Sequence, residues 1–366
     1  PINGSDKPQN RKGYLPTLMP PLIPSTSFAS QVESDSCTLY RGAIAYTLYG
    51  GFVDLDHLLE TAEWTGYLAQ QIQKHLMNNE TEFSFQLHEP ALYFVHINYP
   101  NYWENLPQEK KEKIAHEISI ALGQDFAFTG AIWHEITTWF GYKAMLVPSE
   151  FLSAFSLKNP VSILDGLHGF RYKLSLGSSD SPSAFSWEDP FSGLLGSYIG
   201  AQAIQDTEHL PDEAINIALA RELRILGVQP KSVAKQASKK VKGNPLNWYS
   251  IHYFPFSVSM NKRNFDIGLK NGSITPWLVP YLNKGEQPKP QPYPVPNLDC
   301  LSKYGFSVEL EIKPRESVGP RILDIIYSDR RNTRIQPSIH FPKIMDYIER
   351  EAREKYGPNV DKPYSN

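Results

Sequence analysis

The sequence predicts an α+β protein, with a mainly helical centre and two small patches of antiparallel strand. Two observations support this class. Much of residues 52–228 repeats apolar residues at helical spacing, whereas residues 83–99 and the aromatic segments beyond residue 244 alternate polar and apolar residues, as strands do. No internal repeat is visible along the 366 residues, which favours one interwoven body of helices and strands.

Composition and proline content predict the domain organisation. Residues 1–35 are polar and proline-rich without periodicity, so we expect a flexible N-terminal arm there. Hydrophobic residues make up 41% of the chain, enough for a sizeable core, and we expect residues 36–366 to form a single α+β domain. Beyond residue 244 the sequence changes to aromatic segments that alternate polar and apolar residues, so a sub-boundary near residue 245 remains an alternative.

Helix signals recur through the centre of the chain. The predicted helices span residues 52–77, 107–123, from there to about 141, 187–205, 211–228 and about 342–356. Asp54 or Asp56 caps the first helix, because a short acidic side chain accepts hydrogen bonds from the first free N–H groups. Pro190 falls in a first turn, where proline is tolerated, and Gly227 ends the fifth helix. The basic run 231–242 is interpreted as a solvated helix face or loop.

The strand signals are shorter. Residues 83–99 hold two alternating runs split by Pro90, which predict a hairpin or a pair of strands. Residues 251–259 and 306–312 alternate in the same way. The proline-dense stretch 284–296 between them predicts an extended loop or linker.

Charge excludes some classes of partner. The 36 basic and 39 acidic side chains give a net charge of −3, so no broad positive field attracts nucleic acid. No apolar run reaches membrane-spanning length. The chain begins at Pro1 instead of Met, which indicates a removed upstream segment, and any lipid anchor would lie upstream of residue 1.

Two cysteines are present, Cys37 and Cys300. They predict either one disulfide closing a long loop in an oxidising compartment or two buried thiols. A third alternative makes Cys37 a nucleophile with His57 as its base, but no visible helix start would lower the pKa of that thiol.

The segment 129–141 carries the strongest chemical signal. It places the pair His134-Glu135 inside an apolar helix, where a buried carboxylate costs several kcal/mol unless a charge, proton or metal offsets it. HExxH zinc peptidases carry such a pair with a second His one turn later. Here that position holds Thr138, a poor zinc ligand. A second pair, His116-Glu117, is interpreted as helix surface.

A second window strengthens the metal interpretation. Asp189, Ser192 and Gly196 follow the spacing of the helix that carries the third ligand in thermolysin-like zinc peptidases, which this window resembles, with Asp in place of the usual Glu. His57, in the first turn of the helix 52–77, is the predicted replacement for the missing second histidine. We therefore predict a Zn²⁺ site of His57, His134 and Asp189, with Glu135 as the catalytic base.

Neighbouring polar residues are predicted to hold these ligands in place. Asp54 or Glu60 would contact the second imidazole nitrogen of His57, the usual outer-shell arrangement of a metal-bound histidine. The predicted supporting residues are Asp54, Glu60, Thr138, Glu188 and Ser192.

Three windows together resemble a bacterial family known as domain of unknown function 4056. They are Gly-Gly-Phe-Val-Asp-Leu-Asp-His at 50–57, His-Glu-Ile-Thr-Thr-Trp-Phe-Gly at 134–141 and Glu-Asp-Pro-Phe-Ser-Gly-Leu-Leu-Gly at 188–196. The resemblance implies an exported protein or lipoprotein of the bacterial envelope, periplasmic or associated with the outer membrane, with secretion as the alternative. It implies no particular activity.

Two hypotheses follow for function. The first is a metal-dependent hydrolase acting on a peptide or amide-type substrate of the envelope. The second is a non-catalytic exported binding or scaffold protein in which His134-Glu135 is a buried structural pair. The hydrolase requires His57, His134 and Asp189 to converge beside Glu135, whereas the scaffold predicts that Trp133 and Trp139 seal the pair from solvent.

Overall fold

The computed structural model describes residues 44–87, 91–141, 183–253, 256–282, 287–328 and 331–364. The predicted arm of residues 1–35 and Cys37 lie outside these ranges. Cys300 is half-buried in the short helix α8. Neither the Cys37–Cys300 disulfide nor Cys37 as a nucleophile therefore falls within the described residues.

The described chain confirms an α+β fold. Its helices are α1 (Leu55–Met77), η3 (Trp103–Asn105), α2 (Gln108–Trp139), α5 (Asp189–Ala203), α6 (Pro211–Ile225), α7 (Lys231–Val241), α8 (Asp299–Lys303), α9 (Gly319–Ile326) and α10 (Pro337–Tyr356). Its strands are β1 (Ile44–Thr47), β2 (Gly51–Asp54), β3 (Glu82–Phe85), β4 (Leu92–Asn98), β5 (Tyr249–Tyr253), β6 (Phe256–Met260), β7 (Ser273–Ile274), β8 (Tyr293–Pro294) and β9 (Ser307–Lys313).

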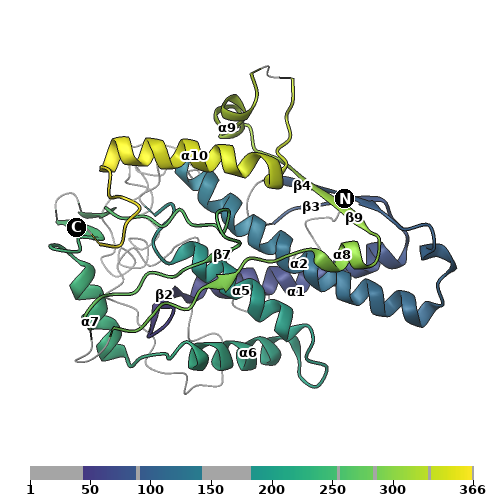
Figure 1. Cartoon of the computed structure of the whole chain (residues 1–366), viewed down its shortest axis with the longest axis horizontal. Coiled ribbons are helices and arrows are strands. Elements are labelled where there is room, and N and C mark those ends of the chain that lie inside the picture. The colour runs from purple at the N-terminus through teal and green to yellow at the C-terminus, as the bar shows by residue number, and fades with distance from the viewer. Residues whose placement is uncertain are drawn as a thin grey trace, which may run out of the picture.

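Helices α1, α2 and α5 form the centre of the molecule (Figure 1). Helices α6 and α7 lie on one side of this group, and α10 and the sheet that contains β4 lie on the other. Helix α5 is apolar and buried over almost its whole length, so it packs inside the group instead of presenting a face to water. The main hydrophobic core runs through all three central helices.

Helix α2 differs from the prediction, because two predicted helices form one continuous helix of 32 residues. Gly123 is an interior residue of this helix and not its end. A Cβ there would lie 2.8 Å from the backbone of both Thr65 and Ala69 on α1. The glycine therefore permits close packing of two helices, and local sequence cannot distinguish that use from a terminator.

The strands form small antiparallel sheets. Strand β4 lies between β3 and β9, with Phe83 opposite Val95 and Val95 opposite Leu310. The predicted hairpin at 83–99 and the strand at 306–312 therefore belong to one sheet. Residues 251–253 and 256–259 belong to the antiparallel strands β5 and β6. The β1–β2 hairpin was not predicted, and it delivers the chain to the start of α1.

The last helix also differs from the prediction. Helix α10 begins at Pro337, five residues earlier than expected, and Pro342 lies inside it near its start. In the parts of the chain that the structure describes, no helix is both long enough and apolar enough to span a membrane.

Candidate metal centre

The first part of the site is the start of α1. Strand β2 ends at Asp54, whose carboxylate caps the helix by accepting hydrogen bonds from the N–H groups of Asp56 and His57, at 2.8 and 3.3 Å. This cap places His57 in the first helical turn. Its side chain keeps 17% of its exposure, whereas Asp54 is fully buried.

The second part is the last two turns of α2. His134 keeps 26% of its side-chain exposure, and Glu135 is buried. The Oε2 atom of Glu135 accepts a hydrogen bond from the backbone N–H of Phe185, in the segment that leads into α5. This bond orients the carboxylate so that Oε1 faces the two histidines.

The third part is the first turn of α5. Glu188 is at its N-cap position, Asp189 is its first residue, and both are buried. The hydroxyl of Ser192 donates to the backbone oxygen of Glu188 at 2.8 Å and accepts from the backbone N–H of Asp54 at 2.9 Å. Ser192 thus joins the start of α5 to the start of α1.

These three helix ends meet around the imidazole of His57. On one edge, Nδ1 lies 3.3 Å from Oδ2 of Asp54 and 3.6 Å from Oδ1 of Asp189. On the other edge, Nε2 lies 4.0 Å from Oε1 of Glu135, which is also 4.0 Å from Nε2 of His134. The two imidazole rings are 5.9 Å apart, centre to centre.

Two groups of side chains in the described residues could hold a metal ion. One consists of His57, His134 and Glu135, and the other of Asp54, His57 and Asp189. His57 belongs to both groups, with one ring nitrogen facing each. The structure thus brings together His, Asp and Glu side chains that could bind a metal ion.

Burial and mutual repulsion shift the carboxyl groups toward their neutral forms. Burial first, and then Asp189, raise the pKa of Glu135 to about 7, although His134 and His57 oppose this shift. Burial first, and then Asp189 and Asp54, raise the pKa of Glu188 well above its usual range. The pKa of Asp189 is also raised, chiefly by burial.

The same carboxylates favour the charged form of the His57 imidazole. Burial lowers the pKa of its imidazole, but the charges of Asp189, Asp54 and Glu135 outweigh burial, and the net pKa lies well above 6.5. A cation at this position is therefore stabilised by its surroundings. A metal ion would experience the same field.

The residues predicted from sequence are partly brought together. His57, His134, Glu135 and Asp189 lie around one centre, with Asp54, Glu188 and Ser192 beside them. Thr138 is buried one turn after His134. Glu60 is exposed, and no ion pair joins it to His57 within the described ranges, so Asp54 alone of the two candidates lies at Nδ1.

Sequence reasoning missed two partners of the site. The fully buried Arg263 acts electrostatically on Glu135 and Asp189, and its guanidinium lies over the rings of Trp139 and Tyr356. The backbone N–H of Phe185 binds Glu135. Neither residue belongs to a motif, and both come from irregular segments, so no spacing rule could have found them.

Trp133 and Trp139, which would seal the pair under the scaffold hypothesis, both contact α10. Trp133 stacks on Phe341 of α10. Trp139 donates its indole N–H to Glu351 of α10 at 2.7 Å. The side chains of His57 and His134 both remain partly exposed to solvent.

These features define the class: an α+β protein in which two half-buried histidines and several buried carboxylates gather at the meeting point of three helix ends. The chain belongs to the family described as Protein of unknown function (DUF4056), whose model matches residues 25–168 and 164–276. The matched residues contain every member of the cluster from Asp54 to Ser192. No curated protein and no solved structure matches the chain.

Proposed function

We propose that this protein is a metal-dependent hydrolase that acts on a peptide or amide-type substrate, with Zn²⁺ as the expected ion. The observation that carries this proposal is the excess of buried acid around two histidines. Asp54, Glu135, Glu188 and Asp189 are all buried, and the buried Arg263 acts electrostatically on two of them, Glu135 and Asp189. Such an excess is costly without a further positive charge.

Unused polar atoms support the fit of a metal. Nδ1 of His57, Oδ2 of Asp54, Oδ1 of Asp189 and Oε2 of Glu188 are buried and have no partner in hydrogen-bond geometry among the described residues. Buried polar atoms are normally paired, so these unpaired carboxylate oxygens indicate a place where added positive charge is favoured. A divalent cation would reduce the repulsion among these carboxylates, and it would suit nitrogen and oxygen ligands.

The ligand types favour His57, His134 and Glu135 as the ligands, because this group supplies two imidazoles beside one carboxylate. Both Nε2 atoms face Oε1 of Glu135 at 4.0 Å, slightly wider than the separation of about 3.3 Å that tetrahedral Zn²⁺ ligands would have. Asp189 lies on the opposite edge of His57, at Nδ1. We therefore exchange two roles proposed from sequence, making Glu135 a ligand and Asp189 a residue that orients His57.

The protein's own groups would then control proton positions at the site. The carboxylates of Asp54 and Asp189 lie 3.3 and 3.6 Å from Nδ1 of His57, and their charge favours a proton on that nitrogen. The lone pair of Nε2 then remains available on the edge of the ring that faces Glu135. Glu135, with a pKa of about 7, becomes anionic near neutral pH. When bound, the ion supplies Lewis-acid activation of water and of a substrate carbonyl.

The activity test uses protein purified without chelator. Zinc-loaded protein, metal-free protein and zinc-treated His134→Ala are each incubated with a mixture of unmodified peptides, and new termini are detected by mass spectrometry. We expect cleavage by the zinc-loaded protein alone. Equal cleavage by the His134→Ala variant, or no cleavage by any sample, would count against a hydrolase at this site.

A Glu135→Gln variant distinguishes the two roles of Glu135. If Glu135 is a ligand, the variant should lose both the ion and turnover, because a neutral amide binds Zn²⁺ weakly. If Glu135 is a general base, the variant should keep the ion and lose only turnover. The Gln side chain still offers an oxygen to the N–H of Phe185, so the fold is retained in either case.

A second candidate function rests on that hydrogen bond. Glu135 is buried and binds the backbone of Phe185, so in a non-catalytic binding or scaffold protein the pair would act as a structural clamp. This alternative predicts no bound metal and a lower melting temperature for Glu135→Ala. The family resemblance supports a location in the bacterial envelope for either function, and cell fractionation tests it.

A further inference from the structure

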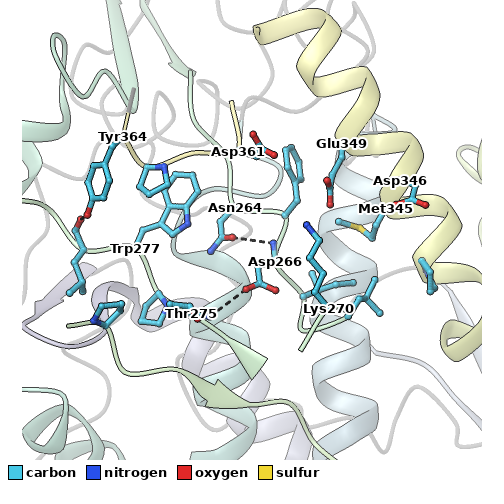
Figure 2. Close-up of a pocket in the computed structure, with 18 of the residues that line it drawn as sticks. Asn264, Asp266, Lys270, Thr275, Trp277, Met345, Asp346, Glu349, Asp361 and Tyr364 are labelled. Atoms are coloured by element: carbon cyan, nitrogen blue, oxygen red, sulfur yellow. Dashed lines mark hydrogen bonds between the residues drawn. The ribbon is translucent and has the colours of Figure 1, made fainter. Parts of the chain in front are cut away.

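A concave site lies away from the candidate metal centre. It is a cavity of about 590 Å³ between the loop 264–278, the helix α10 and the C-terminal segment 361–364 (Figure 2). This volume is typical of small-molecule sites. None of the histidines and carboxylates of the candidate metal centre on α1, α2 and α5 lines this cavity.

One wall of the cavity is aromatic and rich in proline. Trp277 and Tyr364 lie on one side of the cavity in Figure 2, and Pro276, Pro288 and Pro363 add rigid apolar surface. Tyr364 is fixed by a hydrogen bond of 2.8 Å from its hydroxyl to the backbone oxygen of Leu278. Such a wall packs well against an apolar group and attracts a cation over its rings.

The remaining lining carries an excess of negative charge. Asp346 and Glu349 project from α10, Asp266 lies between them and Trp277, and Asp361 stands at the C-terminal edge (Figure 2). Lys270 is the one cationic side chain of this lining. The cavity therefore offers four carboxylates against one ammonium group.

Part of this acid is already neutralised within the protein. Arg353 binds Oε2 of Glu349 at 2.7 Å and Oδ2 of Asp361 at 2.6 Å. No ion pair to Asp266 or Asp346 is found among the described residues, although Asp266 accepts backbone hydrogen bonds from Gly268 at 3.0 Å and Thr275 at 3.5 Å. Asp266 and Asp346 are therefore the acids that remain for a ligand.

We propose that this cavity binds a small organic cation, a primary amine or guanidinium on an apolar stem. The cationic group would lie between Asp266 and Asp346, and the apolar stem would pack on Trp277. An anionic ligand would be repelled by Asp266 and Asp346, and a neutral one would gain only the apolar wall. The site does not depend on the proposed metal, so metal-free protein should bind the same ligand.

The test compares three probes of equal aromatic stem and different charge: phenethylamine, 2-phenylethanol and 3-phenylpropionate. Isothermal titration and ligand-observed NMR on the full chain should show phenethylamine binding about fivefold tighter than either other probe. Asp346→Asn, an exposed substitution that leaves the helix intact, should weaken phenethylamine binding about fivefold. Lys270→Gln should strengthen it, because a repelling charge is removed.

The matched control is Glu104→Gln, which removes an exposed carboxylate on η3, outside this lining. It should leave binding unchanged. Equal binding of the three probes, no binding at the solubility limit, or no effect of Asp346→Asn would each overturn the proposal. Asp266→Asn is a second variant, whose melting curve shows whether the loop around Gly268 and Thr275 is retained.

Discussion

At the residue scale, Asp54 has two separable functions. Its Oδ1 atom caps α1 by accepting from the N–H groups of Asp56 and His57, and its Oδ2 atom faces Nδ1 of His57. Asparagine is as good a cap as aspartate, but it carries no charge. Substitution at this single position can therefore separate helix stability from the electrostatic support of a metal ligand.

We predict that Asp54→Asn keeps the stability of the protein and weakens zinc binding about tenfold, the effect expected for loss of an outer-shell carboxylate. Asp54→Ala should weaken zinc binding similarly and also lower the free energy of unfolding by about 1 kcal/mol, because the cap is lost. Competition with a chromogenic chelator measures the affinity, and urea unfolding measures stability. Unchanged zinc affinity in Asp54→Asn would remove Asp54 from the site.

At the element scale, the site exists because α1 and α5 pack very closely. A Cβ added at Gly196 on α5 would overlap the backbone oxygen of Leu58 on α1. This contact lies at the residue next to His57 on α1 and two turns after Asp189 on α5. The spacing of Asp189, Ser192 and Gly196, which resembles a zinc-peptidase helix, has a packing explanation here as well, since Ser192 joins the two helix starts.

We predict that Gly196→Ala lowers the free energy of unfolding by at least about 2 kcal/mol, because backbone atoms must move apart to admit the methyl group. Gly66→Ala is the matched control within α1. Nothing lies within 4 Å of its added Cβ, so this variant should be more stable by about 0.5–1 kcal/mol. Urea unfolding of both variants tests the pair. Equal effects of the two substitutions would show that close approach at Gly196 is unimportant.

How far the site could be predicted from sequence depends on the range of each interaction. His134, Glu135 and Asp189 stand out locally, because polar residues interrupt apolar helical segments. The meeting of the three helix ends depends on packing over long sequence separations, such as Asp54 with Ser192. The role of each residue in the cluster could not be predicted from sequence, because it depends on which ring nitrogen of His57 faces which carboxylate.

The fold, too, was predicted where it follows from local sequence and missed where it depends on tertiary contacts. The fold class and most helices were predicted, since hydrophobic periodicity is a local property. The continuity of α2 through Gly123 was predicted wrongly, and the β1–β2 hairpin was missed. The first error arose from tertiary contact with α1, and the second from strands that are fully buried and therefore do not alternate.

At the scale of the whole molecule, the buried acids make stability depend on pH. The pKa of Glu135 and of Asp125 is raised to about 7, for each chiefly by burial, and the pKa of Glu188, Asp189 and His57 is also raised. A group with a raised folded pKa contributes stability that is present below its unfolded pKa and is lost as pH rises through the folded value.

We therefore predict that the melting temperature of metal-free protein falls by about 5 °C between pH 5 and pH 8. Zinc should raise the melting temperature more at pH 8 than at pH 6, because ionised ligands bind the ion and protons compete with it. Differential scanning fluorimetry across this range, with and without zinc, makes the comparison. A melting temperature that rises toward pH 8 without metal would contradict these assignments.

The central claim is that the cluster around His57 holds a metal ion. Elemental mass spectrometry on tag-free protein, purified without chelator, measures it most directly, with His134→Ala as the control. We predict about one zinc or similar ion per chain in the native protein and none in the variant. Absence of metal from the native protein, even after incubation with zinc, would contradict the claim and leave His134-Glu135 as a structural pair.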